Sequence, residues 1–299
     1  MKIAIYGQYY KKEASKYIEK LFEVLDENKI EVIVESDFYK EFVAELKLQK
    51  KTIKKYETFS THQDLNTTIN FFFTIGGDGT FLRSITYVRE KNIPILGINI
   101  GRLGFLATVQ KEKIAEAMQQ LLNNEFIIKE RTLLQVNTNP VMENFNELNI
   151  ALNEITIVRK DSTAMITVET HLDDEFLTSY WADGLILSTP TGSTGYSLSC
   201  GGPVITPSAK NFVLTPIAPH NLNARPLVIP DETKIKLKLV GREKQALLSL
   251  DSRIITISND TDIYIEKANF TIKTIQLNTQ TFLKTLRKKL LWGEDVRNE

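Results

Sequence analysis

The first part of the chain alternates short apolar runs with segments whose apolar residues recur at helical spacing. Residues 3–6 are apolar and are closed by a glycine, which predicts a strand. Residues 13–28 carry apolar side chains three and four positions apart, which predicts a helix. Residues 31–34 repeat the strand pattern, and the Lys- and Glu-rich segment 37–56 fits a helix only loosely. This alternation favours an α/β domain.

The pattern then reaches its most apolar strand. Residues 70–75 contain three consecutive phenylalanines, as expected for a strand of a parallel sheet that is covered on both faces. A helix over 81–90 and a strand over 94–98 follow, which completes a β-α-β unit. Three glycines within 97–104 bracket a loop, and a further helix is predicted over 114–122.

Short strands in quick succession begin at about residue 130. Residues 165–171 and 175–180 flank an acidic turn, and residues 234–240 follow a period of two, with polar and apolar side chains alternating as far as Leu239. We therefore predict an all-β domain of layered sheets over 131–280, after an α/β domain over 1–130. The other strands of the all-β domain are predicted at 155–158, 185–187, 246–250, 254–257, 262–266 and 270–276.

The last predicted element, residues 281–291, has an apolar stripe opposite a basic face and is an amphipathic helix. We interpret it as a helix that packs on the protein's own domains. A helix that lies on a membrane surface is the alternative.

Composition narrows the class of protein. The 299 residues are 42% apolar, and 37 basic side chains balance 37 acidic ones, which argues against a nucleic-acid partner. The single cysteine, Cys200, excludes a disulfide framework within the chain and favours a reducing compartment. No apolar run approaches the ~20 residues of a membrane span, and the first residues do not resemble a signal peptide. We expect a soluble cytoplasmic protein without a membrane partner.

The loop Gly76-Gly77-Asp78-Gly79-Thr80 lies between the most apolar strand and a helix. Glycines let backbone amides approach a ligand closely, and a helix N-terminus favours phosphate. Asp78 would repel phosphate, which suits a residue that accepts a proton during phosphoryl transfer or helps to hold a metal. The alternative is a tight turn in which Asp78 or Thr80 only caps the helix. Both the P-loop and the G-x-G-x-x-G dinucleotide motifs are absent from the sequence.

Segment 181–202 holds the densest group of small and hydroxyl residues. We expect its threonine and serine hydroxyls to point out of a glycine-containing loop toward a polar ligand, and Tyr196 to offer a face for stacking a base. A turn that only needs its glycines is the alternative, and a serine nucleophile is disfavoured because no base partner fits. The pair Asn153-Glu154 suits vicinal ribose hydroxyls, although such a pair is by itself nearly uninformative. The four hydroxyls that we expect to point out of this loop are those of Thr189, Thr191, Ser193 and Thr194.

Taken together, these residues resemble the NAD kinase family. The likeness lies in residues 76–83, the pair Asn153-Glu154, residues 183–202 and the proline-rich residues 216–230. The first block is also similar to lipid kinases of the diacylglycerol type and, more loosely, to phosphofructokinases. Residues 183–202 are much more specific to NAD kinases.

The resemblance implies an enzyme that transfers the γ-phosphate of ATP, with Mg²⁺, to the 2′-hydroxyl of the adenosine ribose of NAD. It implies a Rossmann-like α/β domain, a C-terminal β-sandwich and a last segment, 281–299, that packs back on the first domain. It also implies a homodimer or homotetramer, and a magnesium ion held by phosphates and water without a dedicated protein metal site.

The resemblance also assigns roles to residues. Asp78 matches the proton acceptor, and the phosphate-binding loop is matched by Gly76, Gly77, Gly79 and Thr80. The implied NAD-binding residues are Asp78, Gly79, Arg83, Asn153, Glu154, Asp183, Thr194, Gly195, Tyr196, Ser197, Leu198, Ser199, Ala218 and Arg253. Trp181 departs from the family, in which a polar or basic residue is frequent, so the preference between NAD and NADH stays open. The choice between ATP and polyphosphate as donor also stays open.

Two other functions compete with this interpretation. A lipid or other small-molecule kinase would share the glycine loop but would leave residues 183–202 unexplained. A non-catalytic sensor of NAD or NADP would have no need for a carboxylate at Asp78.

Overall fold

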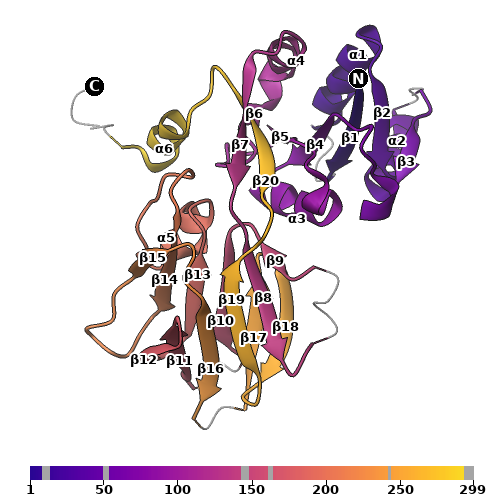
Figure 1. Ribbon diagram of the computed structural model, residues 1–299. Coiled ribbons are helices and arrows are strands. Elements are labelled where there is room, and N and C mark those ends of the chain that lie inside the picture. The colour runs from indigo at the N-terminus through magenta and orange to yellow at the C-terminus, as the bar shows by residue number, and fades with distance from the viewer. Residues whose placement is uncertain (9–13, 50–53, 143–147, 161–163, 242–243, 293–299) are drawn as a thin grey trace. The chain divides into compact units, whose positions relative to one another are not determined.

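The chain forms two compact units, seen in ribbon form in Figure 1. Residues Met1–Glu130 and Ile272–Glu299 form the α/β unit, and Arg131–Thr271 form the β unit. The computed structural model describes residues 1–8, 14–49, 54–142, 148–160, 164–241 and 244–292.

The α/β unit is built on an eight-stranded sheet with the order β3-β2-β1-β4-β5-β20-β7, in which β6 pairs with β5. Strand β1 pairs in parallel with both β2 and β4, and β4 pairs in parallel with β5. The predicted parallel sheet is therefore confirmed. The strands are β1 (Lys2–Gly7), β2 (Glu31–Glu35), β3 (Glu57–Phe59), β4 (Phe71–Gly76), β5 (Ile95–Asn99), β6 (Val109–Gln110), β7 (Phe126–Arg131) and β20 (Ile272–Leu277).

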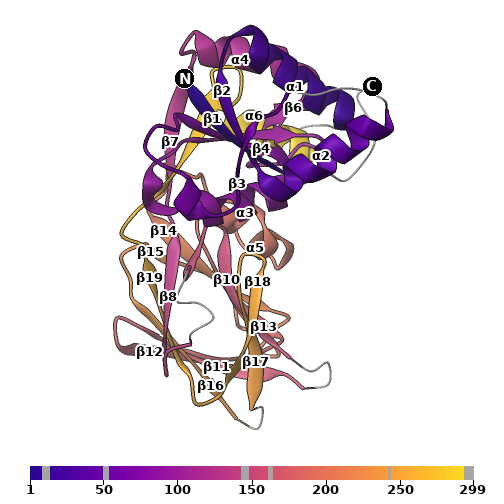
Figure 2. The same ribbon diagram turned by 90° about the vertical axis from the view of Figure 1, so that its right-hand side faces the viewer.

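Helices cover both faces of this sheet (Figure 2). Helices α1, α2 and α4 share one core with inward side chains of the central strands, such as Ile5 and Phe73. On the other face α3 buries Phe81 and Ile85, and the ring of its Tyr87 stacks on Phe72 at 6.3 Å. The helices of this unit are α1 (Ser15–Glu27), α2 (Ser36–Leu48), α3 (Asp78–Val88), α4 (Ile114–Leu122) and α6 (Phe282–Leu290).

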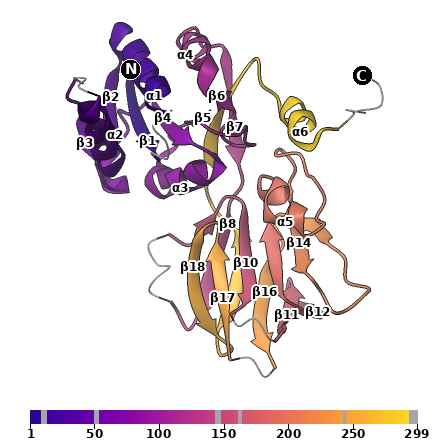
Figure 3. The same ribbon diagram turned by 180° about the vertical axis from the view of Figure 1, so that it is seen from behind.

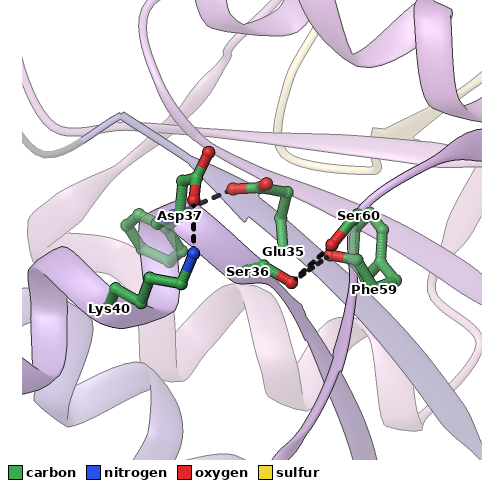
Figure 4. Close-up of polar contacts among 7 residues, drawn as sticks. Glu35, Ser36, Asp37, Lys40, Phe59 and Ser60 are labelled. Carbon is green, nitrogen blue, oxygen red and sulfur yellow. Dashed lines mark hydrogen bonds and ion pairs between the residues drawn. The ribbon is translucent and has the colours of Figure 1, made fainter.

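Helix α2 occupies most of the segment that the sequence placed only loosely. It begins where the carboxylate of Glu35 caps it by accepting a hydrogen bond from the Phe38 N–H at 2.9 Å (Figure 4). The Ser36 hydroxyl donates to the carbonyl of Phe59 at 3.0 Å and lies 2.8 Å from the Ser60 hydroxyl. The two Ser36 contacts attach the start of α2 to the end of β3. The Glu35 carboxylate satisfies a backbone donor that the first turn of the helix leaves free.

Strand β20 corrects one prediction. The sequence placed residues 270–276 in the all-β domain because they continue its run of short strands. In the structure β20 lies between β5 and β7 of the first sheet, and Thr274 pairs in parallel with Ile95. Alternation along a strand reports which faces are buried, but it does not report which sheet the strand joins. The chain therefore re-enters the α/β unit at Ile272, ahead of α6.

Helix α6 contacts the loop that follows β5 in the α/β unit. The ring of Phe282 lies 6.2 Å from that of Phe105, and just before the helix Gln280 donates from its amide to the Thr108 carbonyl at 2.9 Å. The helix is capped by the Thr281 hydroxyl, which accepts from the Lys284 N–H.

The β unit consists of two six-stranded antiparallel sheets that share one core (Figure 3). Ile155 and Leu187 of the first sheet are buried with Val168 and Leu237 of the second. The layered all-β prediction is thus confirmed. The first sheet contains, in order, β15 (Leu227–Pro230), β14 (Asn211–Ile217), β13 (Gly184–Ser188), β10 (Glu154–Arg159), β17 (Gln245–Leu250) and β18 (Arg253–Ser258). The second contains β12 (Glu175–Ala182), β11 (Ile166–Leu172), β16 (Ile235–Val240), β19 (Asp262–Lys267), β8 (Leu134–Asn139) and β9 (Ile150–Ala151).

The acidic turn between β11 and β12 is also confirmed. Asp173 and Asp174 have φ angles of 48° and 68°, a left-handed conformation that Asp tolerates better than most residues. Strands β8, β9, β14 and β15 lie outside the predicted set, and a single-turn helix, α5 (Tyr196–Ser199), follows β13 in the chain.

Candidate active site

The glycine loop of the α/β unit joins β4 directly to α3. The helix begins at Asp78, three residues earlier than the sequence predicts, and its N-cap is Gly77. The alternative in which Asp78 or Thr80 only caps the helix is therefore wrong, since no side chain caps it. The Thr80 hydroxyl instead donates to the Gln8 amide oxygen at 3.2 Å. Gly76 is required for this packing, because a Cβ there would lie 2.2 Å from the Thr80 hydroxyl.

The other two glycines of the loop face open space. Apart from the adjoining residues and the helix's own backbone, a Cβ at Gly77 or Gly79 would meet no atom of the described chain within 4 Å. In the first turn of α3 the amides of Asp78 and Gly79 have no intrahelical acceptor, and the helix dipole favours an anion there. Arg83 is exposed and lies four residues after Gly79, on the same side of the helix. The loop thus has the room and the donors to hold a phosphate.

The carboxylate of Asp78 is fixed by the loop that follows β5. Its Oδ2 accepts the Phe105 N–H at 2.8 Å, and its Oδ1 accepts the N–H groups of Leu106 at 3.0 Å and Ala107 at 2.9 Å. A Cβ at Gly104 would lie 1.9 Å from Oδ1, so only glycine allows this approach. A carboxylate has about four acceptor positions, so three bonds leave room for a substrate hydroxyl.

Asn99 shapes that loop and was not predicted as a functional residue. Its side-chain amide donates to the carbonyls of Arg102 at 2.8 Å and Ala107 at 3.2 Å, and its Oδ1 accepts the Gly101 N–H at 2.8 Å. Gly97 lies within β5, as the strand predicted over 94–98 requires, and a Cβ there would come within 2.6 Å of the Ala107 Cα. The clustered glycines were the one sequence signal for this arrangement.

In the β unit, the structure brings Asn153 and Glu154 against the loop that follows β13. A Cβ at Gly192 would lie 2.1 Å from the Asn153 carbonyl oxygen, and one at Gly195 would lie 3.0 Å from Glu154 Oε2. The Thr189 N–H donates to the Asn153 carbonyl at 2.9 Å. Two segments about 40 residues apart in the sequence therefore form one cluster.

Two side-chain atoms of this cluster are buried without a partner. Within the described residues, Asn153 Oδ1 and Glu154 Oε2 have no hydrogen bond. Buried polar atoms are rarely left unpaired in folded proteins, so both are places where a ligand would supply the missing hydrogen bond. The ring of Tyr196 is 42% exposed and follows Gly195 directly, so a base has a free aromatic face nearby.

Burial raises the pKa of the Glu154 carboxyl to about 8, and the nearby negative charge of Asp251 adds to this shift. The Tyr196 backbone N–H donates a hydrogen bond to the Glu154 carboxyl, which lowers its pKa and partly offsets the rise. The carboxyl is therefore mostly neutral at pH 7, when it can donate one hydrogen bond as well as accept.

Most hydroxyls of the loop after β13 do not face a ligand, and this prediction was wrong. The Thr189 hydroxyl donates to the Leu152 carbonyl at 2.6 Å, Ser193 donates to the Pro190 carbonyl at 2.7 Å, and Thr194 donates to the Thr191 carbonyl at 3.3 Å. Short hydroxyl side chains readily bond to nearby backbone groups, and a tight loop leaves many such groups to satisfy. The hydroxyls build the loop that places Tyr196.

The remaining residues of α5 divide by exposure. The Ser197 hydroxyl is buried and lies 2.8 Å from that of Thr215, whereas Leu198 is half-buried and Ser199 is exposed. The side chain of Ser197 therefore supports the loop from behind.

Asp183 lies between β12 and β13 and forms an ion pair with Arg159 at 3.2 Å. Its backbone N–H donates to the Ile217 carbonyl, next to Ala218, which is exposed and has a φ of 43°. Trp181, two residues earlier, packs on the His220 ring with centroids 4.1 Å apart. The structure thus groups Asp183 and Ala218 at one end of the β unit's strands. Trp181, which differs from the residue type frequent in the family, lies at the same end.

Arg253 and Asp251 come from the turn between β17 and β18. The Arg253 guanidinium donates to the carbonyls of Leu148 and Ile150. Asp251, which the sequence interpretation missed, accepts backbone N–H groups from Leu152, Asn153 and Glu154. An Asp in a tight turn is too common to single out from sequence.

Family models match both units. Residues 3–126 match the ATP-NAD kinase N-terminal domain, and residues 152–277 match the ATP-NAD kinase C-terminal domain. The chain belongs to the NAD kinase family. It is 58% identical to the NAD kinase of Christiangramia forsetii over 298 residues and 55% identical to that of Flavobacterium psychrophilum over 299, with all of each chain covered. Membership of the NAD kinase family in both halves sets aside the lipid-kinase alternative.

Solved structures of NAD kinases have the same fold. Yeast NADH kinase in complex with NADH matches with a TM-score of 0.85 at 22% identity, covering 100% of this chain and 89% of that chain. An NAD kinase from Archaeoglobus fulgidus in complex with ATP matches with a TM-score of 0.74 at 25% identity, covering 97% and 99%. Among the described helices, none is long and apolar enough to span a membrane.

Proposed function

We propose that this enzyme transfers the γ-phosphate of ATP to the 2′-hydroxyl of the adenosine ribose of NAD, with Asp78 as the proton acceptor. Full-length identity of 58% to an NAD kinase supports the reaction. The observation that supports the role of Asp78 is its carboxylate, held by three backbone N–H groups next to glycines that face open space.

In the proposed step, the ribose oxygen forms a bond to the γ-phosphorus while the bond from that phosphorus to the β,γ-bridging oxygen breaks. The hydroxyl proton passes to Asp78, and ADP leaves with the electron pair of the broken bond. The amides of Asp78 and Gly79 hold the phosphates, with Gly76, Gly77 and Thr80 shaping the loop. Positioning and charge stabilisation supply most of the rate in such a transfer.

We propose Mg²⁺, or another divalent metal, as the partner of ATP. Among the described residues, no group of three or more His, Cys, Asp or Glu side chains is arranged to hold a metal ion. Mg²⁺ prefers phosphate oxygens and water with one or two carboxylates, so ATP itself would supply most of its ligands. When bound, the ion neutralises the charge that develops on the phosphates.

On the NAD side, we propose that Asn153 Oδ1 accepts a hydrogen bond from the adenosine and that the neutral Glu154 carboxyl donates one to it, because the atoms Asn153 Oδ1 and Glu154 Oε2 are buried and lack partners in the described chain. Tyr196 would stack on the adenine, and Asp183 would bind the nicotinamide half. The further proposed NAD contacts are Asp78, Gly79, Arg83, Thr194, Gly195, Ser197, Leu198, Ser199, Ala218 and Arg253. Thr194, Ser197 and Arg253 would act through the backbone that they hold, since their polar groups bond within the protein.

The family likeness also supports three proposals about the compartment, the assembly and the substrates. We propose that the enzyme works in the cytoplasm, assembles as a homodimer or homotetramer, and uses NAD and ATP as its substrates.

One assay tests the reaction. Purified protein is incubated with ATP, Mg²⁺ and NAD, and the product is measured with an NADP-specific dehydrogenase. We expect NADP to accumulate with time and enzyme concentration. Folded protein that binds NAD without forming NADP would instead support the sensor alternative, and folded protein that does neither would exclude both.

A second prediction concerns pH. Because the Glu154 pKa lies at about 8, the KM for NAD of the wild type is expected to rise as the pH passes 8 and the carboxyl loses its proton. Glu154→Gln mimics the neutral carboxyl, so its KM should stay within about 3-fold of wild type at pH 7 and remain flat to pH 9. The measurement is KM for NAD at half-unit pH steps, at saturating ATP.

The stability of the wild type should also depend on pH and should fall as the pH rises. A carboxyl whose pKa is raised on folding keeps its proton in the native state between pH 4.5 and about 8, while the unfolded chain has lost it. Wild-type stability therefore falls with rising pH across this window relative to Glu154→Gln, and urea unfolding at pH 5 and pH 8 measures it.

The KM measurements can also contradict the neutral carboxyl. A wild-type KM for NAD that is flat to pH 9, together with a KM raised 10-fold or more in the Gln variant at pH 7, would show that Glu154 works as a carboxylate.

A further inference from the structure

The turn between β17 and β18 holds the backbone of segment 148–154 from the side opposite the loop that follows β13. Asp251 begins this turn with a φ of 52°, and its own N–H donates to the Glu154 carbonyl at 3.0 Å. The pairing of Ile155 with Leu250 places the turn beside the start of β10. The turn is thus attached to the two residues that carry the unpartnered atoms Asn153 Oδ1 and Glu154 Oε2.

The Asp251 carboxylate makes three further bonds to this segment. Its Oδ2 accepts the Leu152 N–H at 2.9 Å, and its Oδ1 accepts the N–H groups of Asn153 at 2.8 Å and Glu154 at 3.2 Å. Three consecutive N–H groups that point to one side chain cannot take part in a regular strand ladder, in which successive groups alternate in direction. The carboxylate therefore fixes a backbone conformation that the strand alone would not adopt.

Arg253 fixes the preceding residues in the complementary way. Its guanidinium donates to the Leu148 and Ile150 carbonyls, so the turn supplies acceptors to the later residues and donors to the earlier ones. On the other side, the Thr189 hydroxyl and N–H bond to the carbonyls of Leu152 and Asn153. Both the amides and the carbonyls at 152–153 are therefore occupied, and the atoms left without a partner are Asn153 Oδ1 and Glu154 Oε2.

From this geometry we infer that Asp251 is a positioning residue for NAD, which orients Asn153 and Glu154 through their backbone and does not itself contact the substrate. The inference rests on the proposed role of Asn153 and Glu154 in binding the adenosine. It also explains why a carboxylate is needed: an amide has one acceptor oxygen, and its NH₂ group would oppose one or two of the three N–H donors.

The test compares Asp251→Asn with a matched control, Asp231→Asn. Asp231 is a buried carboxylate of the same unit that pairs with Lys267 at 2.8 Å and lies outside the proposed site. Asp251→Asn is expected to raise the KM for NAD about 10-fold or more, with kcat and the KM for ATP changed less than about 3-fold. Asp231→Asn is expected to leave the KM for NAD unchanged, whatever it does to stability. Calorimetric titration with NAD alone measures the same loss without turnover.

A second variant keeps the inference testable if Asn does not fold. Asp251→Gly removes the carboxylate and suits the positive φ, so it lowers the strain of the turn while it frees the three N–H groups. It should show the same rise in KM for NAD. A folded variant that binds NAD within 2-fold of wild type overturns the inference, and so does failure of both variants to fold, since Asp251 would then serve folding. If the wild type binds NAD but forms no NADP, the proposed reaction fails while the titrations still decide the role of Asp251.

Discussion

Replacing Asp78 by Asn is expected to lower the rate of NADP formation by ~10²-fold or more while the fold stays intact, the scale of lost general-base catalysis. The amide cannot accept the ribose proton. It also offers one acceptor oxygen where the carboxylate accepts three N–H groups, from Phe105, Leu106 and Ala107. The loop after β5 should therefore loosen, and stability should fall by about 1–3 kcal/mol. Steady-state kinetics and thermal unfolding on the same preparation measure the two effects.

Glu35→Gln is the matched control for this variant. Glu35 is also an acidic residue of the α/β unit whose carboxylate accepts a backbone N–H, that of Phe38, but it only caps α2. We expect Glu35→Gln to lower stability by about 1 kcal/mol or less and to leave turnover unchanged. Near-normal turnover by Asp78→Asn would remove its proposed role, and an equal loss of turnover in both variants would show that the effect comes from stability.

Replacing Gly192 by Ala is expected to damage the NAD half of the site. The new Cβ would lie 2.1 Å from the Asn153 carbonyl oxygen and 2.7 Å from its Cα, so backbone must move. Overpacking of this kind costs about 1–3 kcal/mol or more, and here it displaces Asn153 itself. We expect lower stability together with a KM for NAD raised at least about 10-fold, measured by unfolding and by kinetics at saturating ATP.

Gly201→Ala separates strain from displacement in this experiment. Gly201 ends the same loop with a φ of 84°, and a Cβ there would meet no described protein atom within 4 Å. Alanine should cost about 1 kcal/mol through its backbone conformation, with no change in the KM for NAD. If Gly192→Ala changes stability no more than Gly201→Ala and leaves the KM intact, the contact between the loop and Asn153 does not position the substrate.

The pattern of apolar residues predicted an element of the fold well where that element depends on neighbouring residues of the sequence. Helix α4 was predicted with the bounds it has, Ile114–Leu122, because its apolar spacing is unbroken. The apolar run at 70–75 predicted a central strand of a parallel sheet, since only such a strand is buried on both faces. The destination of β20 was missed, because pairing partners are chosen over long sequence distances.

The candidate site shows the same division more sharply. The sequence pointed to Asp78, the glycine loop, Asn153, Glu154 and Tyr196, because rare combinations of glycine, carboxylate and aromatic residues stand out. It assigned the loop hydroxyls to a ligand, whereas Thr189 and Ser193 bond to nearby backbone. Composition shows that hydrogen-bonding groups are present, but only the folded loop decides which of them are already satisfied.

The sequence by itself determined the order of elements, the two kinds of domain and the residues that resemble those of NAD kinases. Only the tertiary structure decided what surrounds them. Asp78 is held by the loop after β5, and the backbone of Asn153 and Glu154 is held by Asp251, about 100 residues away. Both arrangements depend on backbone N–H groups, which every residue except proline carries and which therefore leave no trace in the sequence.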